Sequence, residues 1–281
     1  MKIVISTILA LVAFAMNSVL CRLALGQGAI DAASFSTIRL GSGAVMLLLI
    51  TAIFKRGKTQ TPGGNWTSAL LLFLYAIAFS LAYINLSAGT GALILFGSVQ
   101  ATMILAALLS GERPRVTEWL GLVLALTGLV YLVFPGLKAP PLLSSSLMAV
   151  AGISWGFYSL RGRGAKDPLL ATTGNFLRSV PLVVAVNLAL VASLHVSARG
   201  ALFAFLSGAV TSGVGYVIWY SALKGLTATR AAMVQLAVPL LAALGGVALL
   251  SEEITLRLLL AGIMILGGVG LALAGRKPSS S

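Results

Sequence analysis

The chain has 281 residues, of which 59% are hydrophobic and 9% charged, and its mean hydropathy is +1.04. A soluble domain carries about 25% charged residues, so this composition excludes an ordinary soluble fold and indicates a membrane protein. The formal net charge of +13 would suggest nucleic-acid binding in a soluble chain. Here the basic residues stand in short gaps between apolar runs and signal topology, so we expect the lipid bilayer as a partner and no nucleic acid.

Ten apolar runs follow one another along the chain, each long enough to form a transmembrane helix. About 20 apolar residues cross the hydrocarbon core as a helix, and unbroken runs exclude the alternating strands of a barrel. The first run resembles a signal peptide, but it is long enough to span and has no clear Ala-x-Ala site, so we expect it to remain uncleaved. The helices are expected at residues 3–25, 32–54, 66–86, 90–110, 116–134, 142–160, 169–194, 200–223, 228–250 and 255–274.

The basic residues predict the orientation of these helices. If the N-terminus is inside, thirteen lysines and arginines fall in inner segments and four in outer segments, while Arg39 and Arg178 lie within helices. Lys and Arg accumulate in cytoplasmic loops. We therefore expect a multi-pass protein with both termini cytoplasmic and, since the widest gap at 55–65 is short, with no soluble domain.

The second half of the chain repeats the first at an offset of about 140 residues. Leu-Ser-Gly-Glu at 109–112 matches Leu-Ser-Glu-Glu at 250–253, and Arg39 pairs in order with Arg178. Five helices per half is an odd number, so the two copies enter the membrane from opposite sides. In agreement with this, the basic loops are 2–3 and 4–5 in the first half but 6–7 and 8–9 in the second. The pattern predicts an all-α membrane protein with two inverted five-helix repeats, residues 1–139 and 140–281, around a central cavity. Transporters use such repeats for alternating access.

Several short motifs accompany this repeat. They are the Leu-Ser/Gly-Glu motif before helices 5 and 10, Trp155-Gly156, Tyr-Ser-Ala-Leu-Lys at 220–224, Ala231-Ala232 and Pro239. With them the whole chain resembles the ten-helix EamA type of the drug/metabolite transporter superfamily, and it is most similar to the amino-acid exporters of that family. The resemblance implies a cavity lined by helices 1, 3, 4, 6, 8 and 9, and export of metabolites across a bacterial inner membrane. Many relatives carry Glu-Pro in helix 9, where this chain has Ala237-Val238 before Pro239.

The six acidic residues all fall in loops or at helix ends. Proton-coupled exporters of organic cations use a carboxylate within the membrane, and none is expected there. The sequence therefore favours a facilitative exporter of small neutral or zwitterionic metabolites, with amino acids, including aromatic ones, as the expected substrates. A multidrug or nucleotide-sugar carrier and a pore stay open as alternatives. The acidic residues are Asp31, Glu112, Glu118, Asp167, Glu252 and Glu253.

Aromatic and amide side chains within the helices are the candidates for substrate binding. Tyr75, Phe79 and Tyr83 share one face of the third helix, although such a stripe serves packing equally often. A buried amide either faces a cavity or bonds another helix, and four amides fall on the helices that line the cavity in the family. The candidate substrate-binding residues are Asn17, Phe79, Tyr83, Asn85, Gln100, Trp155, Tyr158, Tyr216, Trp219, Tyr220 and Gln235.

Three further residues and two absences complete the expectations. Arg39 and Arg178 either take a substrate carboxylate or are structural, reaching the interface or a backbone carbonyl, and Pro239 is a hinge candidate. One cysteine, Cys21, and one histidine, His195, leave no cluster of metal ligands, so we expect no metal and no cofactor. The helices contain neither a Ser-His pair nor paired aspartates, so we expect no enzyme. The sequence leaves the oligomeric state open, and a monomer is plausible.

Overall fold

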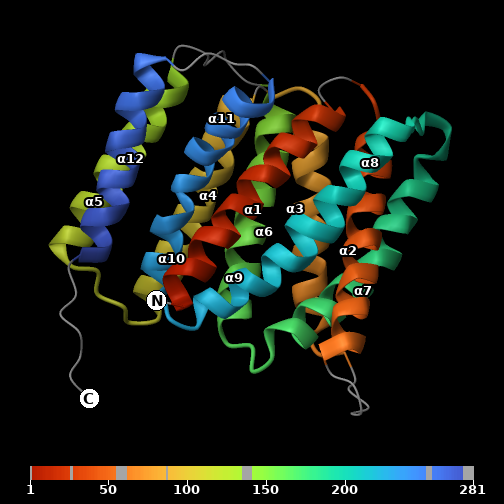
Figure 1. Ribbon diagram of the computed structural model, residues 1–281, viewed down its shortest axis with the longest axis horizontal. Helices are drawn as coiled ribbons and strands as arrows, with labels where there is room; N and C mark the ends of the chain where they lie inside the picture. Colours follow the sequence, from red (N-terminus) through yellow and green to blue (C-terminus); the bar gives the residue numbers. More distant parts are fainter. Residues whose placement is uncertain are drawn as a thin grey trace.

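The computed structural model describes residues 2–25, 28–54, 62–86, 88–134, 141–250 and 255–274, and these residues form a bundle of helices (Figure 1). Apart from one isolated bridge between Ile30 and Val196, the described residues form no β-structure. The α-helices are α1 Lys2–Leu25, α2 Ala32–Phe54, α3 Trp66–Ala82, α4 Ala88–Leu109, α5 Val116–Val133, α6 Leu142–Arg163, α7 Pro168–Ala189, α8 Ala198–Leu206, α9 Gly215–Leu223, α10 Ala228–Gln235, α11 Ala237–Leu250 and α12 Leu256–Ala274.

These helices account for the ten predicted spans. Helices α1 to α7 are one span each, α8 and α9 belong to the eighth, α10 and α11 form the ninth, and α12 is the tenth. Among the described residues, six helical runs are long and apolar enough to cross a membrane, and three shorter helices are also apolar. Large apolar side chains such as Leu49, Val123 and Ile263 are exposed on the outer helices, as expected for surfaces that contact lipid. The predicted all-α membrane fold is confirmed.

The eighth and ninth spans are both irregular. Between α8 and α9 lies a π-helix, η3, Ser207–Val214. The ninth span is interrupted at Leu236, between α10 and α11. Pro239 explains this break, because proline has no N–H to donate to the carbonyl of residue 235 and its ring clashes with that carbonyl. Irregular backbone of this kind in a membrane is tolerated where it lies inside the protein, often at a functional site.

The two halves of the chain pack on each other in a symmetric way. Helix α1 of the first half packs on helices of the second half, namely α8, η3, α9 and α11. Correspondingly, α6 of the second half packs on α3 and α4 of the first. The α2–α7 and α5–α12 pairs join corresponding helices directly. If every span is exchanged with the one five places later, this set of pairs is reproduced. Each half therefore forms its core largely with the other half.

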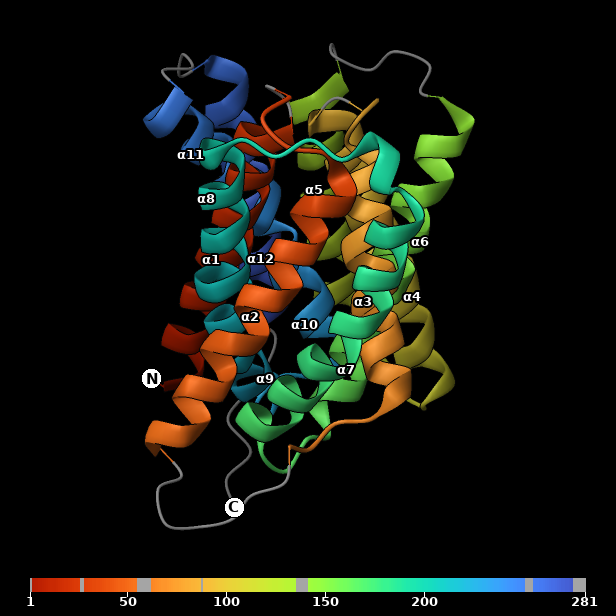
Figure 2. The ribbon, with the colours of Figure 1, turned by 90° about the vertical axis from the view of Figure 1, so that its right-hand side faces the viewer.

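The connections between helices meet at two opposite ends of the bundle. At one end Arg161 reaches Asn65, and Glu112 binds both Arg163 and the start of α10. We call this end, formed by residues 62–65, 110–115, 161–167 and 224–230, the basic face. At the other end Ile30 pairs with Val196, and the segment that leads into α8 runs across this end (Figure 2). The connections between spans 2 and 3 and between spans 7 and 8 thus lie at opposite ends, as inverted repeats require.

Helices α5 and α12 stand together at one edge of the molecule (Figure 1). Their backbones approach closely at two glycines, because a Cβ at Gly268 would lie 2.5 Å from the carbonyl oxygen of Gly121. Small residues permit such close helix packing in membranes. This pair contacts α4, α10 and α11, and none of its residues lines the central cavity described below.

Candidate functional site

A small cavity lies in the middle of the bundle, where the ninth span is broken. Its wall comes from α1, α3, α4, α6, α10 and α11, and its volume of about 20 Å³ holds roughly one water molecule. The cavity is therefore small, because side chains occupy most of the space between these helices. The lining residues are Phe14, Ser18, Tyr75, Phe79, Leu95, Phe96, Trp155, Gln235 and Val238.

Trp155 on α6 is the centre of this wall. Its ring centroid lies 4.8 Å from that of Tyr216, 5.0 Å from that of Tyr75 and 5.1 Å from that of Phe14. The indole N–H donates a 2.7 Å hydrogen bond to Oε1 of Gln235. Aromatic pairs at these distances attract each other more strongly than their burial alone would give. The wall of the cavity is therefore mostly aromatic, and it contains one amide.

Gln235 owes its position to the helix break. It is the last residue of α10, and its Nε2 donates to the carbonyl oxygen of Ala231 at 3.0 Å. Both ends of its amide are therefore fixed, one by its own helix and one by Trp155. Polar groups at discontinuous helices form substrate sites in transporters with inverted repeats.

Behind the cavity wall lies Arg39 on α2, whose exposed fraction is 1%. Its Nε donates to the Ser212 hydroxyl at 2.9 Å, and its Nη2 donates to the hydroxyls of Tyr216 at 2.8 Å and Tyr75 at 3.4 Å. The Cζ atom lies 5.2 Å from the ring centroid of Tyr75 and 5.9 Å from that of Phe79, within range of cation–π attraction. The guanidinium thus lies beside two aromatic residues that also line the cavity.

A column of rings leads from the cavity towards the basic face. Tyr158 lies between Trp155 and Tyr220, with ring centroids 5.8 Å and 5.3 Å away. The Tyr220 hydroxyl donates to the backbone oxygen of Tyr158 at 3.2 Å. Tyr220 also lines a pocket of about 440 Å³ at the basic face, beside Asn175 and Arg161. Rings in contact therefore separate this mouth from the central cavity.

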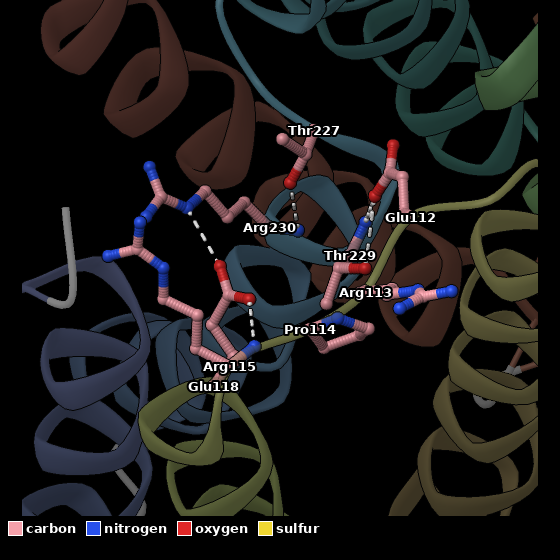
Figure 3. Close-up of a pocket in the computed structure, with 8 residues that line it drawn as sticks. All are labelled: Glu112, Arg113, Pro114, Arg115, Glu118, Thr227, Thr229 and Arg230. Carbon is pink, nitrogen blue, oxygen red and sulfur yellow. Dashed lines mark hydrogen bonds and ion pairs between the residues drawn. The ribbon is translucent and has the colours of Figure 1, made fainter. Parts of the chain in front are cut away.

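A second pocket at the basic face, of about 180 Å³, contains two carboxylates (Figure 3). Glu112 accepts hydrogen bonds from the backbone N–H groups of Ala228 and Thr229 and from Arg163 at 3.1 Å. Glu118 binds Arg230 at 3.1 Å. We call Glu112, Glu118 and these partners the carboxylate clasp, because they join the starts of α5 and α10 to the end of α6.

The pKa values of two carboxyl groups in the connections are below their usual range. Burial alone would raise the pKa of Glu112, but hydrogen bonds from the Ala228 and Thr229 backbone and from Arg163 outweigh it and lower the value. At the opposite face burial would likewise raise the pKa of Asp31, and backbone N–H groups of Ser34 and His195 lower it. Both carboxylates are therefore ionised at neutral pH.

The structure brings together only some of the predicted site residues. Phe79, Trp155 and Gln235 line the cavity. Tyr216 and Tyr158 contact the ring of Trp155. Other candidates stand around this group: the ring of Tyr83 packs on Phe79 at 4.8 Å, Trp219 donates to Ser159, and Tyr220 lines the mouth.

Two predicted amides bond other helices. Asn17 accepts hydrogen bonds from Ser207 and Thr211 of η3. Gln100 donates to the carbonyl oxygen of Ala232 at 2.7 Å, while its own side-chain oxygen has no hydrogen-bond partner in the described part of the chain. Neither residue lines the cavity, so their described contacts are between helices.

Asn85 does not lie within a helix as expected. Helix α3 ends at Ala82, four residues before the predicted end, and Asn85 is exposed in the following turn. Its backbone N–H donates to the Ala82 carbonyl, a turn that asparagine favours over helix. Its side-chain amide donates to the Ser144 hydroxyl of α6 at 3.4 Å, and a role in substrate binding stays a prediction.

Arg178 and Pro239 also have definite places. The Arg178 Nη1 donates to the carbonyl oxygens of Gly63 at 2.7 Å and Gly174 at 2.9 Å, so this arginine holds the connection before α3 against α7. Pro239 lies in the first turn of α11, just after the break at Leu236. The break is consistent with the predicted hinge, whose motion stays a prediction.

Sequence reasoning omitted several lining residues. Tyr75 belonged to the recognised stripe with Phe79 and could have been chosen with it. Phe14, Leu95 and Phe96 are apolar residues in apolar helices, and Ser18 is a small residue of the kind that often packs. Because helices in lipid are apolar on all sides, no periodicity distinguishes the face that lines a cavity.

Comparisons with known proteins show the family and the fold to which the chain is similar. The model of the EamA-like transporter family matches residues 1–134 and again 142–274. An uncharacterized protein of Pseudomonas aeruginosa is 52% identical over 270 residues, covering 96% of this chain and 94% of its own. The uncharacterized transporter YoaV of Bacillus subtilis is 24% identical, covering 84% and 85%. A solved crystal structure that is 19% identical superposes with a TM-score of 0.80 over 95% of this chain and 98% of its own. The chain therefore belongs to the EamA-like transporter family and is a multi-pass membrane transporter of the drug/metabolite superfamily.

Proposed function

We propose that the protein is a facilitative exporter of small neutral or zwitterionic metabolites, with amino acids, aromatic ones included, as its substrates. The observation that carries this proposal is the aromatic cavity around Trp155, with the fixed amide of Gln235 in its wall. Flat apolar side chains fit between rings, and a few placed polar groups give orientation. The resemblance of the sequence to the amino-acid exporters of this family favours the same substrate class.

The placement of the acidic residues supports transport driven by the substrate gradient. Asp31, Glu112, Glu118 and Asp167 lie before or in the first turn of a helix, at the ends of the bundle, while Glu252 and Glu253 fall outside the described residues. A cation/proton exchanger would need a carboxylate beside the cavity to exchange substrate for protons. A neutral or zwitterionic substrate needs no such group.

The closed cavity and the two ends of the bundle suggest how access alternates. Substrate enters from the basic face when Tyr158 and Tyr220 part and the carboxylate clasp opens, and the break at Leu236 lets α10 move relative to α11. The inverted halves then open the opposite face by the corresponding movement. In this proposal the basic face is cytoplasmic, both termini lie on that side, and the membrane is the bacterial inner membrane.

Counterflow in proteoliposomes tests the substrate class. Vesicles loaded with one unlabelled compound are assayed for uptake of labelled L-phenylalanine, with aromatic and aliphatic amino acids, a nucleoside and a quaternary cation as the panel. We expect saturable exchange with amino acids that persists without a pH gradient. Exchange only with nucleosides or cations, or uptake that collapses without the gradient, would contradict the proposal, and non-saturable flux without trans-stimulation would indicate a pore.

A pair of tryptophan variants tests the site, and cysteine labelling tests the orientation. Trp155→Leu should abolish exchange, whereas Trp66→Leu, at an exposed helix start, should leave it intact.

The labelling experiment uses a Cys21→Ser background. In it, Lys166→Cys should react with an impermeant maleimide only from the cytoplasm and Ser193→Cys only from outside. Labelling of both from one side would contradict the orientation.

A further inference from the structure

Arg39 is a buried cation whose hydrogen-bonding capacity the fold leaves partly unused. Three of its contacts go to neutral hydroxyls, those of Ser212, Tyr216 and Tyr75. Its Nη1 has no hydrogen-bond partner among the described groups, and the described carboxylates lie at the ends of the bundle. A buried charge without an anionic partner is costly, so its presence calls for a partner that arrives from elsewhere.

The position of Arg39 connects it with the transport pathway. The rings of Tyr75 and Phe79 lie within cation–π range of the guanidinium, and both residues also line the cavity. Rotation of either ring about its side-chain torsions would therefore enlarge the cavity on the side of Arg39. Ser212 and Tyr216, from the eighth span, accept hydrogen bonds from Nε and Nη2 of Arg39 and so fix the plane of the guanidinium group.

We propose that Arg39 is the receptor for a carboxylate group of the transported molecule, which Nη1 binds when Tyr75 or Phe79 turns aside. The inference rests on the proposed function and narrows its substrate class to small organic carboxylates with an apolar or aromatic group. The guanidinium supplies charge-assisted donors in a fixed fork that matches a carboxylate. The aromatic wall around Trp155 takes the remainder of the molecule.

The repeat provides a matched comparison for this role. Arg178 is the counterpart of Arg39 in the second half, and its Nη1 already donates to the carbonyls of Gly63 and Gly174. Arg178 therefore holds two segments together and does not border the cavity. Replacing either arginine by lysine keeps the charge and removes the fork, so only the variant at a carboxylate receptor should change selectivity.

The experiment measures binding and transport separately with three related probes. L-phenylalanine carries both a carboxylate and an amine, 3-phenylpropionate only the carboxylate, and phenethylamine only the amine. Purified wild type, Arg39→Lys and Arg178→Lys are first checked for a single symmetric peak in size-exclusion chromatography. Dissociation constants are then obtained from ligand-induced thermal shifts, and counterflow is measured in proteoliposomes.

We expect the two carboxylate probes to bind wild type and Arg178→Lys, and Arg39→Lys to bind them about 10- to 100-fold more weakly, as expected for hydrogen bonds to a charged group. Arg178→Lys makes the same change at a position that joins two segments, so it should retain the preference for carboxylates. If Arg178→Lys loses binding of the carboxylate probes as fully as Arg39→Lys, the effect at Arg39 is structural and the inference is overturned. Equal binding of phenethylamine, or unchanged binding in Arg39→Lys, overturns it as well.

The two proposals fail in different ways. Carboxylate binding that depends on Arg39, without counterflow of L-phenylalanine, would refute the proposed amino-acid transport and support the receptor. Counterflow that is normal in Arg39→Lys, with no preference among the probes, would refute the receptor and support the transport.

Discussion

Neutralising Glu112 should favour the opening of the basic face, because this carboxylate joins three segments of the chain. It accepts hydrogen bonds from the first backbone N–H groups of α10, from the Thr229 hydroxyl and from Arg163. Glu112→Gln keeps the size of the side chain and removes its charge. Because the N-cap of α10 is Thr227 and glutamine keeps one acceptor oxygen, the variant only weakens the hydrogen bonds to Ala228 and Thr229, at a cost of about 1 kcal/mol.

The ion pair with Arg163 adds less to this estimate. The Glu112 side chain is 25% exposed and the Arg163 side chain 38%. Solvent screening therefore limits the contribution of this ion pair to at most about 1 kcal/mol. The sum of roughly 1 to 2 kcal/mol corresponds to a 5- to 30-fold change in the ratio of closed to open molecules. This change is large enough to measure and too small to unfold the protein.

Cysteine accessibility measures this ratio directly. Cys21 is the one cysteine of the chain, so Cys21→Ser with Ser18→Cys places a single thiol in the cavity wall. Applied from the basic face, an impermeant maleimide should react about 5 to 30 times faster in the Glu112→Gln variant. Val123→Ala, on the lipid-facing side of α5, serves as the control. An unchanged rate in Glu112→Gln would refute the role of the clasp in closing this face.

Three further predictions follow from the structure. Because the lowered pKa of Glu112 keeps it ionised above the ordinary value of 4.5, its stabilising effect should be constant from pH 6 to 8 and decline only as pH falls through the lowered pKa. The ratio of the labelling rates of Glu112→Gln and its parent, taken at each pH so that the pH dependence of the thiol reaction cancels, measures this effect. Gly268→Val should lower the thermal midpoint in detergent without changing substrate preference, because its side chain would meet the Gly121 carbonyl at a cost of about 1 to 3 kcal/mol. Trp155→Phe keeps a ring but loses the hydrogen bond to Gln235, and should weaken substrate binding about 3- to 10-fold in equilibrium binding measurements.

Much of the fold could be predicted from the sequence because helices in lipid must be long and apolar. Each predicted span contains a helix, and the break in the ninth span follows from Pro239. The π-helix at 207–214 has no comparable signal, since Ser, Gly, Ala, Val and Thr occur in regular helices as well. It depends on contacts with α1 and α2 that only the folded chain provides.

The site was less predictable than the fold. Trp155 and Gln235 stood out as an aromatic residue and an amide on expected cavity helices, and both line the cavity. Arg39 lies close enough in sequence to the end of its helix that reaching the interface was the stronger expectation. Its burial depends on Ser212 and Tyr216 in the second half of the chain, and no sequence pattern around Arg39 indicates such distant partners.

The long separation between these partners has a consequence for biogenesis. Asn17 and Arg39 bind Ser207 and Ser212, which follow them by 190 and 173 residues. At about 5 to 20 residues per second, the ribosome needs on the order of 10 to 40 s to make the missing segment. During that interval an amide and a guanidinium in already inserted helices must be solvated by water or lipid headgroups. The first two helices therefore reach their final positions only after the eighth span has been synthesised.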